Sequence, residues 1–380
     1  MTPQTQTKMN KIQETSMESM EKNQFFGNTY KERRVLITGH TGFKGSWLSL
    51  WLKELGASIT GVSLPPETTP NHWDLLKLEI ADNRMDIRDI NRLQKIVEDC
   101  QPEIVFHLAA QPLVRRSYRD PLETWSTNVI GTANLLEACR HCPSVKAVVV
   151  VTTDKCYENQ EWQWGYCEND RLGGHDPYSA SKAAAELVVA SYRQSFFNKQ
   201  EAILIASARA GNVIGGGDWS EDRLIPDIIR SVENNESLVI RSPKATRPWQ
   251  HVLESLSGYL LLGQYLLSAE SSFAEAWNFG PGTEGNQNVE KVLSLIKKDL
   301  PLFRWEQTNE IQPHEATLLQ LDSAKAQQRL KWNPVWSFEE GIAETANWYK
   351  NYIETGVVIS LQQIHKYTLA ARKAKITWAL

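Results

Sequence analysis

Five short runs rich in Val, Ile, Leu and Ala alternate with longer amphipathic stretches between residues 33 and 210. The apolar runs span residues 35–39, 57–64, 103–110, 147–153 and 202–208. Helices are expected through Trp47 and Leu48, and near 89–99, 120–142 and 178–198. Strands that read as near-continuous apolar runs and are joined by helices indicate a parallel sheet covered on both faces. The pattern therefore predicts an α/β fold built on a doubly wound parallel sheet.

The length of the chain and a change of rhythm after Arg209 indicate a second, smaller domain. The chain has 380 residues, more than the roughly 250–300 at which a single core stops growing. The expected parts are an unstructured tail over 1–30, a sheet domain over 31–210 with a returning segment at about 250–276, a smaller C-terminal α/β substrate domain over the rest of 211–355, and an extension over 356–380.

Composition points to a small-molecule ligand. The formal net charge is −4, with 41% apolar and 23% charged residues, so nucleic acid and anionic membranes are not expected partners. No run reaches the roughly 18 apolar residues of a membrane helix, and the polar N-terminus lacks the apolar centre of a signal peptide. A cytoplasmic chain with reduced cysteines is expected. Cys139 and Cys142 form only half of a four-ligand zinc pattern, so no metal site is expected.

A glycine-rich turn follows the first strand and precedes the first helix. It reads Thr-Gly-His-Thr-Gly-Phe-Lys-Gly over 38–45, with glycines at 39, 42 and 45. Glycines at this spacing let the backbone approach a pyrophosphate, which then lies on the N-terminus of the helix. The strand-turn-helix context makes the sheet domain a Rossmann fold that binds a dinucleotide. The expected cofactor contacts in the turn are Gly39, Thr41, Gly42, Phe43, Lys44 and Gly45.

Other pieces of the first domain fit the same cofactor. Asp86 and Ile87 follow the third strand, where adenine would lie, and Leu108, Ala109 and Ala110 end a strand with small residues against which a ribose can pack. The acid that commonly binds the adenosine ribose at the end of the second strand is missing, since Ser63 stands there. No arginine replaces it in the sequence, so NAD is favoured over NADP. His40 and Lys44 are expected either to neutralise cofactor phosphates or to face solvent.

Tyr178 and Lys182 stand four residues apart at the start of an expected helix. This spacing puts both side chains on one helix face, about 5–6 Å apart at Cβ, so the ammonium can lie beside the phenol. Lowering a tyrosine pKa from about 10 to near 7 takes roughly 4 kcal/mol. One cation at 4 Å supplies about that much at an effective dielectric of 20. The pair therefore predicts a tyrosine base.

The motifs together resemble those of the extended short-chain dehydrogenase/reductase superfamily over about residues 33–350, and within it the nucleotide-sugar 4,6-dehydratases. The resemblance rests on the glycine turn, the Tyr-Lys pair and the segments TGHTGFKGSWL (38–48), TTDKCYEN (152–159), ARAGNVIGGGDW (208–219), RPWQHVLE (247–254) and QPHEA (312–316).

The resemblance implies an NAD-dependent dehydration of a nucleotide-activated glucose, with CDP-glucose as the expected substrate. Elimination of water across C5 and C6 needs a base at C5 and an acid for the departing C6 hydroxyl. Tyr178 would take the C4 hydroxyl proton and Thr153 would hydrogen-bond the C4 oxygen. Asp154 would be the acid and Lys155 the base, where sister enzymes have Asp-Glu. Glu158 remains an alternative base, with Lys155 then polarising the keto oxygen.

The resemblance also assigns substrate contacts, largely to the second domain, and an assembly. Asn128 is assigned to the cofactor, and a homodimer or homotetramer that serves deoxyhexose synthesis for O-antigen polysaccharides is implied. The implied substrate-binding residues are Asn212, Arg223, Leu224, Ile225, Pro226, Arg247, Asn278 and His314.

Two other functions keep part of this pattern. A nucleotide-sugar 4-epimerase of the same fold would need the glycine turn, Tyr178 and Lys182, but no acid at Asp154 to expel water. A non-catalytic NAD-binding sensor would need the glycines alone. The acid at Asp154 discriminates the dehydratase from both.

Overall fold

The computed structural model describes residues 24–197, 203–308 and 318–380. Residues 1–23 of the expected unstructured tail lie outside this range. For residues 25–30 the expectation is wrong, because Phe25, Phe26 and Tyr30 are buried in the main core. Burial of large aromatic side chains stabilises a segment that the sequence alone left without a partner.

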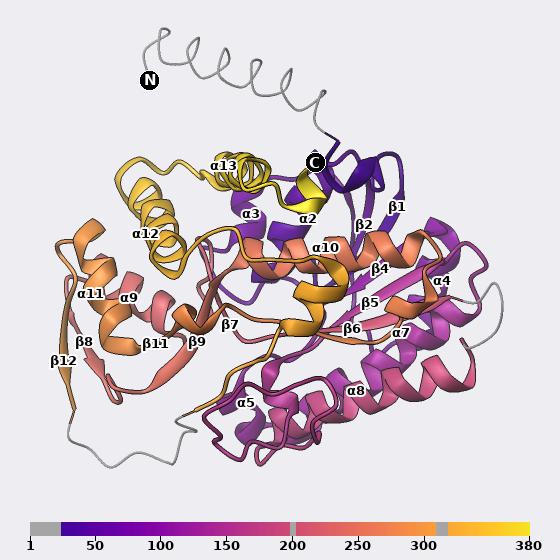
Figure 1. Cartoon of the computed structure of the whole chain (residues 1–380), viewed down its shortest axis with the longest axis horizontal. Helices are drawn as coiled ribbons and strands as arrows, with labels where there is room; N and C mark the ends of the chain where they lie inside the picture. The colour runs from indigo at the N-terminus through magenta and orange to yellow at the C-terminus, as the bar shows by residue number, and fades with distance from the viewer. Residues whose placement is uncertain (1–23, 198–202, 309–317) are drawn as a thin grey trace, which may run out of the picture.

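The core of the fold is a seven-stranded sheet in which every pair of neighbours is parallel. Its order, β10-β6-β5-β4-β1-β2-β3, confirms the Rossmann prediction. Figure 1 labels β6, β5, β4, β1 and β2 of this sheet. The order reverses between β1 and β4, and ligands bind at such a switch point beyond the carboxyl ends of the strands. The strands are β1 (Arg34–Thr38), β2 (Ser58–Ser63), β3 (Ala81–Arg84), β4 (Ile104–His107), β5 (Ala147–Val151), β6 (Leu204–Ala210) and β10 (Ala276–Phe279).

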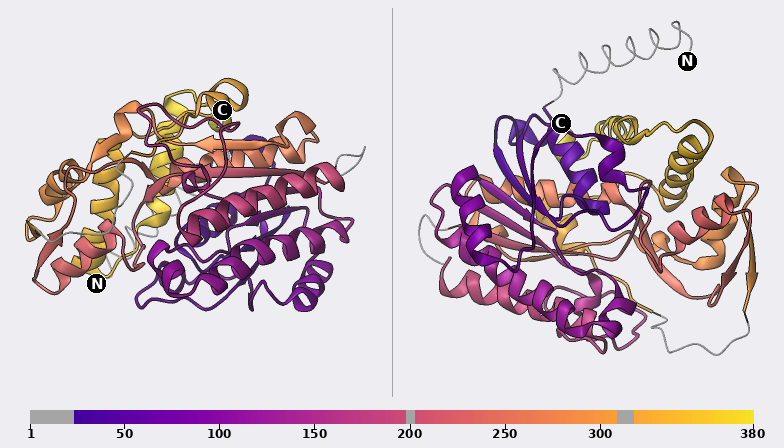
Figure 2. Two further views of the ribbon diagram at one scale, coloured as in Figure 1. Left: turned by 90° about the horizontal axis from the view of Figure 1, so that it is seen from below. Right: turned by 180° about the vertical axis from the view of Figure 1, so that it is seen from behind.

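Helices cover both faces of this sheet because successive strand residues point to opposite sides. Val35 and Ile37 face a core that includes Trp47 of α2, whereas Leu36 between them faces a second core that includes Leu93 of α4. Figure 2 shows the two layers. One face carries α2 (Phe43–Glu54) and α10 (Val252–Leu267), and the other carries α4 (Ile90–Cys100), α7 (Gly131–Arg140) and α8 (Pro177–Ser195).

The helix expected over 120–142 is divided into three pieces. These are α6 (Pro121–Trp125), the π-helical turn η2 (Ser126–Ile130) and α7. Asp120 caps α6 by accepting a hydrogen bond from the backbone N–H of Glu123, a contact that satisfies an otherwise unpaired donor of the first turn. The two shorter helices near this sheet are α3 (His72–Leu76) and α5 (Val114–Arg119).

A smaller part of the chain follows β6 and lies beside the carboxyl ends of the strands (Figure 1). It holds a three-stranded sheet of β7 (Asn212–Ile214), β9 (Thr246–His251) and β11 (Asn286–Asn288), and a parallel pair of β8 (Ser237–Ile240) and β12 (Arg304–Gln307). The chain returns to the large sheet through α10 and β10. The other helices and turns between residues 211 and 355 are α9 (Leu224–Glu233), η4 (Ser271–Phe273), η5 (Thr283–Gly285), α11 (Val289–Asp299), η6 (Ala326–Leu330) and α12 (Phe338–Thr355).

The two ends of the described chain pack together against α2. The turn η1 (Phe25–Asn28) contacts η7 (Thr377–Ala379), which follows α13 (Ser360–Lys373). The rings of Phe26 and Trp378 are stacked with centroids 4.9 Å apart, and Trp51 of α2 meets both edge-on. The C-terminal segment is therefore part of the core.

The structure also bears on disulfides, metal sites and membrane helices. Cys139 and Cys142 are buried free thiols, and no group of three or more His, Cys, Asp or Glu side chains among the described residues could hold a metal ion. Within the same residues, no helix combines the length and the apolar character needed to cross a bilayer.

Candidate active site

The glycine turn forms a tight cradle at the switch point between β1 and β4. Gly39 has φ +76°, and a Cβ there would lie 2.6 Å from the backbone N of Ala109, while one on Gly45 would lie 2.0 Å from the carbonyl oxygen of Gly39. Gly42 is the N-cap of α2, is exposed and provides no side-chain cap. The free N–H groups of the first turn of α2 are thus left for an anion, and the cradle fits the pyrophosphate of a dinucleotide.

The other predicted cofactor residues surround this turn at the ends of β2, β3 and β4. Thr41 is buried and shares a hydrogen bond with the Ser63 hydroxyl at 2.7 Å. Asp86 is partly exposed and is held by Arg88 through both carboxylate oxygens. Leu108, Ala109 and Ala110 are half-buried directly after β4, next to Gly39. The structure brings these predicted residues to one edge of the sheet.

Asn128 and Ile87 support the site from behind. The Asn128 side chain is 1% exposed, and its amide binds the backbone N–H and C=O of Gln111 and the hydroxyl of Ser181. The expectation that Asn128 contacts the cofactor is therefore wrong, since its hydrogen bonds join the segment after β4 to α8. Ile87 is 4% exposed and packs on Gly131.

His40 does neither of the two things expected of it. Its ring is fully buried between Gly61 and Trp73, and its Nε2 lies 2.9 Å from the carboxylate of Asp82. Burial lowers the pKa of His40, so the ring is a packing element that neither binds phosphate nor faces solvent.

Lys44 points inward from α2 toward the catalytic groups. Its Nζ donates to the hydroxyl of Tyr259 on α10 at 3.3 Å. Burial, aided by the positive charges of Arg223 and Lys182, lowers the pKa of Lys44 to about 7, and the charge of Asp154 opposes this shift. Lys44 therefore belongs to the same electrostatic cluster as the carboxyl at the end of β5, and it does not face solvent.

Tyr178 and Lys182 lie in the first turns of α8, and both are 7% exposed. The Lys182 ammonium donates to the carbonyl of Val151 at 3.5 Å; no hydrogen bond joins it to the phenol among the described residues. Burial raises the pKa of Tyr178 to about 12, while a hydrogen bond with Thr153 and the charge of Arg223 act to lower it. Burial lowers the pKa of Lys182 to about 8.

The segment after β5 places a threonine and an acid near the phenol, and a lysine follows them. The Thr153 hydroxyl donates to Asp154 Oδ1 at 2.9 Å and accepts from the backbone N–H of Lys155 at 3.3 Å, starting the turn η3 (Asp154–Cys156). Asp154 is 3% exposed, and burial raises its pKa despite the nearby charge of Lys155. No ion pair joins Asp154 to Lys155 in the described part of the chain, and the Lys155 side chain is half-buried.

Gly211, which the sequence did not single out by itself, packs against Asp154. A Cβ at this position would lie 2.9 Å from Asp154 Oδ2 and 3.1 Å from Pro248. Only glycine leaves room for the carboxyl here. The signal in the sequence was the glycine at the exact change of rhythm between β6 and β7.

A buried ion pair lies under the catalytic segment and was also missed. Glu186 accepts from Arg209 Nη2 at 2.8 Å, from Ser207 at 2.7 Å and from Thr152, and the two charged side chains are each 3% exposed. Arg209 also donates to the Tyr157 hydroxyl. Glu186 follows Lys182 by four residues, and an acid on the buried face of an expected helix was the available signal.

Most of the predicted substrate residues lie on α9 and on the strands β7 and β9. Arg223 caps α9 and pairs with Asp218 at 3.0 Å, with 35% of its side chain exposed. Its charge reaches Tyr178, so it belongs to the site. Leu224 is half-buried, and Ile225 and Pro226 are buried in the first turn of α9. Asn212 and Arg247 are half-buried on the neighbouring strands β7 and β9.

Asn278 is a structural residue, so the expectation that it binds substrate is wrong. It is fully buried, accepts from the Tyr157 hydroxyl at 2.8 Å, and donates to the carbonyls of Tyr166 and Asp322. Its amide therefore joins three segments and presents nothing to a ligand. His314 and the QPHEA segment (312–316) lie outside the described residues.

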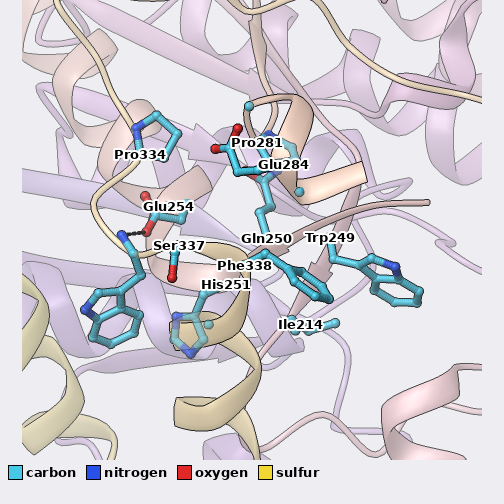
Figure 3. A pocket seen from close by; sticks show the side chains of 14 residues that line it. Ile214, Trp249, Gln250, His251, Glu254, Pro281, Glu284, Pro334, Ser337 and Phe338 are labelled. Carbon is cyan, nitrogen blue, oxygen red and sulfur yellow. Dashed lines mark hydrogen bonds between the residues drawn. The ribbon is translucent and has the colours of Figure 1, made fainter. Parts of the chain in front are cut away.

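Figure 3 shows a small cavity between β9 and α12 that is not the ligand site. Its volume is about 20 Å³, room for a single water. Gln250 Oε1 and His251 Nε2 at this cavity are buried without a hydrogen-bond partner. Beside them, burial raises the pKa of Glu254 to about 7, opposed by hydrogen bonds from the backbone of Trp336 and from Tyr367. The cavity is a packing gap behind the predicted substrate strand.

The sequence of the chain is similar to those of nucleotide-sugar dehydratases. Residues 36–345 match the family described as GDP-mannose 4,6 dehydratase. The chain is 48% identical over 358 residues to the CDP-glucose 4,6-dehydratase of Salmonella typhimurium, covering 91% of this chain and 99% of that relative. It is 27% identical to a dTDP-glucose 4,6-dehydratase of Xanthomonas campestris, covering 83% of this chain and 92% of that relative.

Solved structures share the fold. An epimerase, Mth375 of Methanothermobacter thermautotrophicus, superposes with a TM-score of 0.76 at 25% identity, covering 86% of this chain and 95% of that chain. DesIV, the dTDP-glucose 4,6-dehydratase of Streptomyces venezuelae solved with NAD and TYD bound, gives 0.71 at 24% identity, covering 84% and 97%. The likeness to DesIV shows the fold alone. From the family match and the 48% identity across nearly the whole chain, this protein belongs to the GDP-mannose 4,6 dehydratase family.

Proposed function

We propose that the chain is a hydro-lyase that converts CDP-glucose to CDP-4-dehydro-6-deoxyglucose and water, with NAD recycled in each turnover. The observation that carries the proposal is the buried carboxyl of Asp154, which is held by Thr153 next to Tyr178 and has its pKa raised by burial. A carboxyl with a raised pKa keeps its proton to higher pH, and this favours donation of that proton to a departing hydroxyl group. The relative with 48% identity supports the nucleotide.

The phenol and the threonine would act first, at C4 of the glucose. Tyr178 would take the proton of the C4 hydroxyl, and Thr153, which acts to lower the pKa of Tyr178, would bind the C4 oxygen. NAD, when bound, supplies an acceptor for the C4 hydride, which is later returned to C6. Its positive nicotinamide ring would lower the pKa of Tyr178 from the value near 12 that burial imposes. Lys182 would hold the nicotinamide-side ribose and keep positive charge near the site.

The elimination step would use the two residues of η3. Asp154 would give its proton to the departing C6 hydroxyl, and Lys155 would take the C5 proton, made acidic by the C4 ketone. Glu158, the alternative base, is ion-paired with Arg171 at 2.9 Å. Its carboxylate is already directed to the Arg171 guanidinium, which supports Lys155 as the base. The lack of an ion pair between Asp154 and Lys155 in the described chain also supports the assignment, since direct pairing would favour the ionised carboxylate over the proton-bearing acid.

The substrate would lie between the large sheet and the smaller part of the chain. Arg223, with one guanidinium edge on Asp218, and Arg247 on β9 would bind the diphosphate, because a guanidinium fork matches phosphate oxygens in two-point contact. Asn212 and Leu224 would line the sugar side. The division into a dinucleotide-binding part and a nucleotide-sugar-binding part is a proposal on the same grounds.

Assembly and cellular role are proposed from the resemblance of the sequence motifs. A cytoplasmic homodimer or homotetramer serving O-antigen deoxyhexose synthesis is proposed. In support of assembly, α6, η2 and α8 expose large apolar side chains, with Leu122, Ile130 and Leu187 each more than half exposed. Light scattering of the purified chain tests this part, and a monomer at micromolar concentration would contradict it.

The test of the activity is a substrate panel. The protein is incubated with NAD and, separately, CDP-, dTDP- and UDP-glucose and GDP-mannose, and the 4-keto product is followed by its absorbance in alkali and by loss of water in the mass spectrum. We expect product from CDP-glucose. No product from any of the four would overturn the proposal.

An isosteric variant tests the role of the carboxyl. Asp154→Asn keeps the size of the side chain but removes the proton that it donates, so water loss should slow far more than hydride removal. Reduced cofactor and 4-keto-glucose should then accumulate. An equal loss of both steps would contradict the assigned role. An epimerase would instead return the C4 epimer of its substrate with its C6 oxygen retained. That product has the mass of the substrate and is separated from it by chromatography.

A further inference from the structure

The end of β2 has no free acid for the adenosine ribose. In Rossmann folds a carboxylate here accepts from the ribose 2′-hydroxyl and repels the 2′-phosphate of NADP. In this chain Ser63 ends β2, and its hydroxyl is bound to Thr41. Glu67, the next acid along the chain, is ion-paired with Arg116 at 2.7 Å.

An arginine from the neighbouring strand occupies this edge instead. Parallel pairing sets Arg84 of β3 opposite Ser63 of β2, and Arg84 Nη1 donates to the carbonyl of Leu64, the residue that follows β2, at 3.3 Å. The guanidinium lies 5.7 Å from the centre of the Trp73 ring, and 32% of the side chain is exposed. Arg84 is therefore fixed at the end of β2 with one part open to a ligand.

The carboxylate nearest to Arg84 is already engaged within the protein, and its charge is balanced by Arg84. Asp82 Oδ2 accepts from Arg84 Nε at 3.0 Å and Nη2 at 2.7 Å, and Asp82 Oδ1 bonds to the buried ring of His40 at 2.9 Å. Both oxygens are thus occupied within the protein. A guanidinium carries five N–H groups, and three of those of Arg84 are engaged within the protein. One N–H group on Nη1 and one on Nη2 remain for a ligand. The group that faces outward at this edge is therefore a positively charged hydrogen-bond donor.

We propose that the site binds NADP as well as NAD, and that Arg84 is the residue that contacts the 2′-phosphate. The proposal rests on the proposed function in one respect, that a nicotinamide dinucleotide lies on the glycine turn. A guanidinium held in place by Asp82 and Trp73 is prearranged to donate two hydrogen bonds to a phosphate. No described carboxylate at the end of β2 is free to repel that group.

Binding, measured without turnover, tests the proposal. The full chain, freed of bound nucleotide, is titrated calorimetrically with NAD and with NADP. We expect dissociation constants for the two that differ by about tenfold or less. Arg84→Met should weaken NADP binding by about tenfold to a hundredfold, the effect of a lost charge-assisted hydrogen bond, and should leave NAD binding within about threefold. Ser63→Asp, which restores the missing acid, should also weaken NADP binding selectively.

A matched control separates a specific contact from general charge. Arg92 is an exposed arginine in the first turn of α4, so Arg92→Met removes the same charge without touching the end of β2. Near-ultraviolet circular dichroism verifies that each variant is folded. NAD binding with no NADP binding would overturn the inference and leave the proposed function standing, whereas no binding of either nucleotide would overturn the proposed function. Equal losses of NADP affinity in Arg84→Met and Arg92→Met would refute the role of Arg84.

Discussion

Replacing Arg209 by methionine leaves the carboxylate of Glu186 buried without its counter-charge. In the native chain Glu186 is 3% exposed and accepts from Arg209, Ser207 and Thr152. Burial acts to raise the pKa of Glu186, but Arg209 and the hydrogen bonds outweigh it and hold that pKa below its ordinary value of 4.5. Removing one partner of a buried ion pair costs about 3–5 kcal/mol of unfolding free energy.

The size of this loss depends on pH, and the sign follows from the two pKa values. The native carboxyl, with its lowered pKa, loses its stabilising contribution only as pH falls below 4.5. In the variant the pKa of Glu186 should rise above that value, so stability falls as pH rises beyond it. The folded variant can avoid the buried charge by protonating Glu186. Protonation costs about 1.36 kcal/mol for each pH unit above the ordinary pKa, so the electrostatic part of the loss in unfolding free energy is at most about 3 kcal/mol at pH 7. That part should vanish near pH 4.5.

Urea unfolding at pH 7 and at pH 5, followed by both tryptophan fluorescence and circular dichroism, measures the effect. The Arg209→Met deficit should shrink by about 2–3 kcal/mol between the two, and adding Glu186→Gln should recover part of the loss. The control is Arg119→Met, which breaks the exposed pair with Glu221 and should cost no more than about 1 kcal/mol. A deficit independent of pH, or additive losses in the double variant, would refute the reasoning.

Three further outcomes are expected. Gly211→Ala should slow water loss about tenfold to a hundredfold, because a methyl group 2.9 Å from Asp154 Oδ2 must displace the acid; quenched-flow mass spectrometry with an unchanged unfolding midpoint checks this. Trp378→Ala should lower the unfolding free energy by about 3–5 kcal/mol, whereas Leu380→Ala, at an exposed position, should not. The rate of water loss should fall as pH rises through the raised pKa of Asp154, and a rate that does not depend on pH would contradict its role as the acid.

Local patterns in the sequence determined the sheet and the main candidate catalytic groups. The apolar runs predicted five of its strands within a few residues, because a strand buried on both faces admits few polar side chains. The glycine turn, the four-residue spacing of Tyr178 and Lys182 and the Thr-Asp-Lys segment were visible because each depends on one short stretch of backbone. The structure lays the glycine turn at the carboxyl end of β1 and the Thr-Asp-Lys segment at that of β5, with Tyr178 and Lys182 in the first turns of α8.

Only the tertiary structure decided which distant segments meet. Phe26 stacks on Trp378. Asn278 makes hydrogen bonds to one side chain and two backbone carbonyls, and His40 is buried between Gly61 and Trp73. The arginine that the sequence lacks beside Ser63 arrives from β3 as Arg84. Hydrophobic burial is nondirectional, so composition shows that a side chain will be buried without showing against what. Partners across a sheet or between the two ends of the chain follow from register and packing alone.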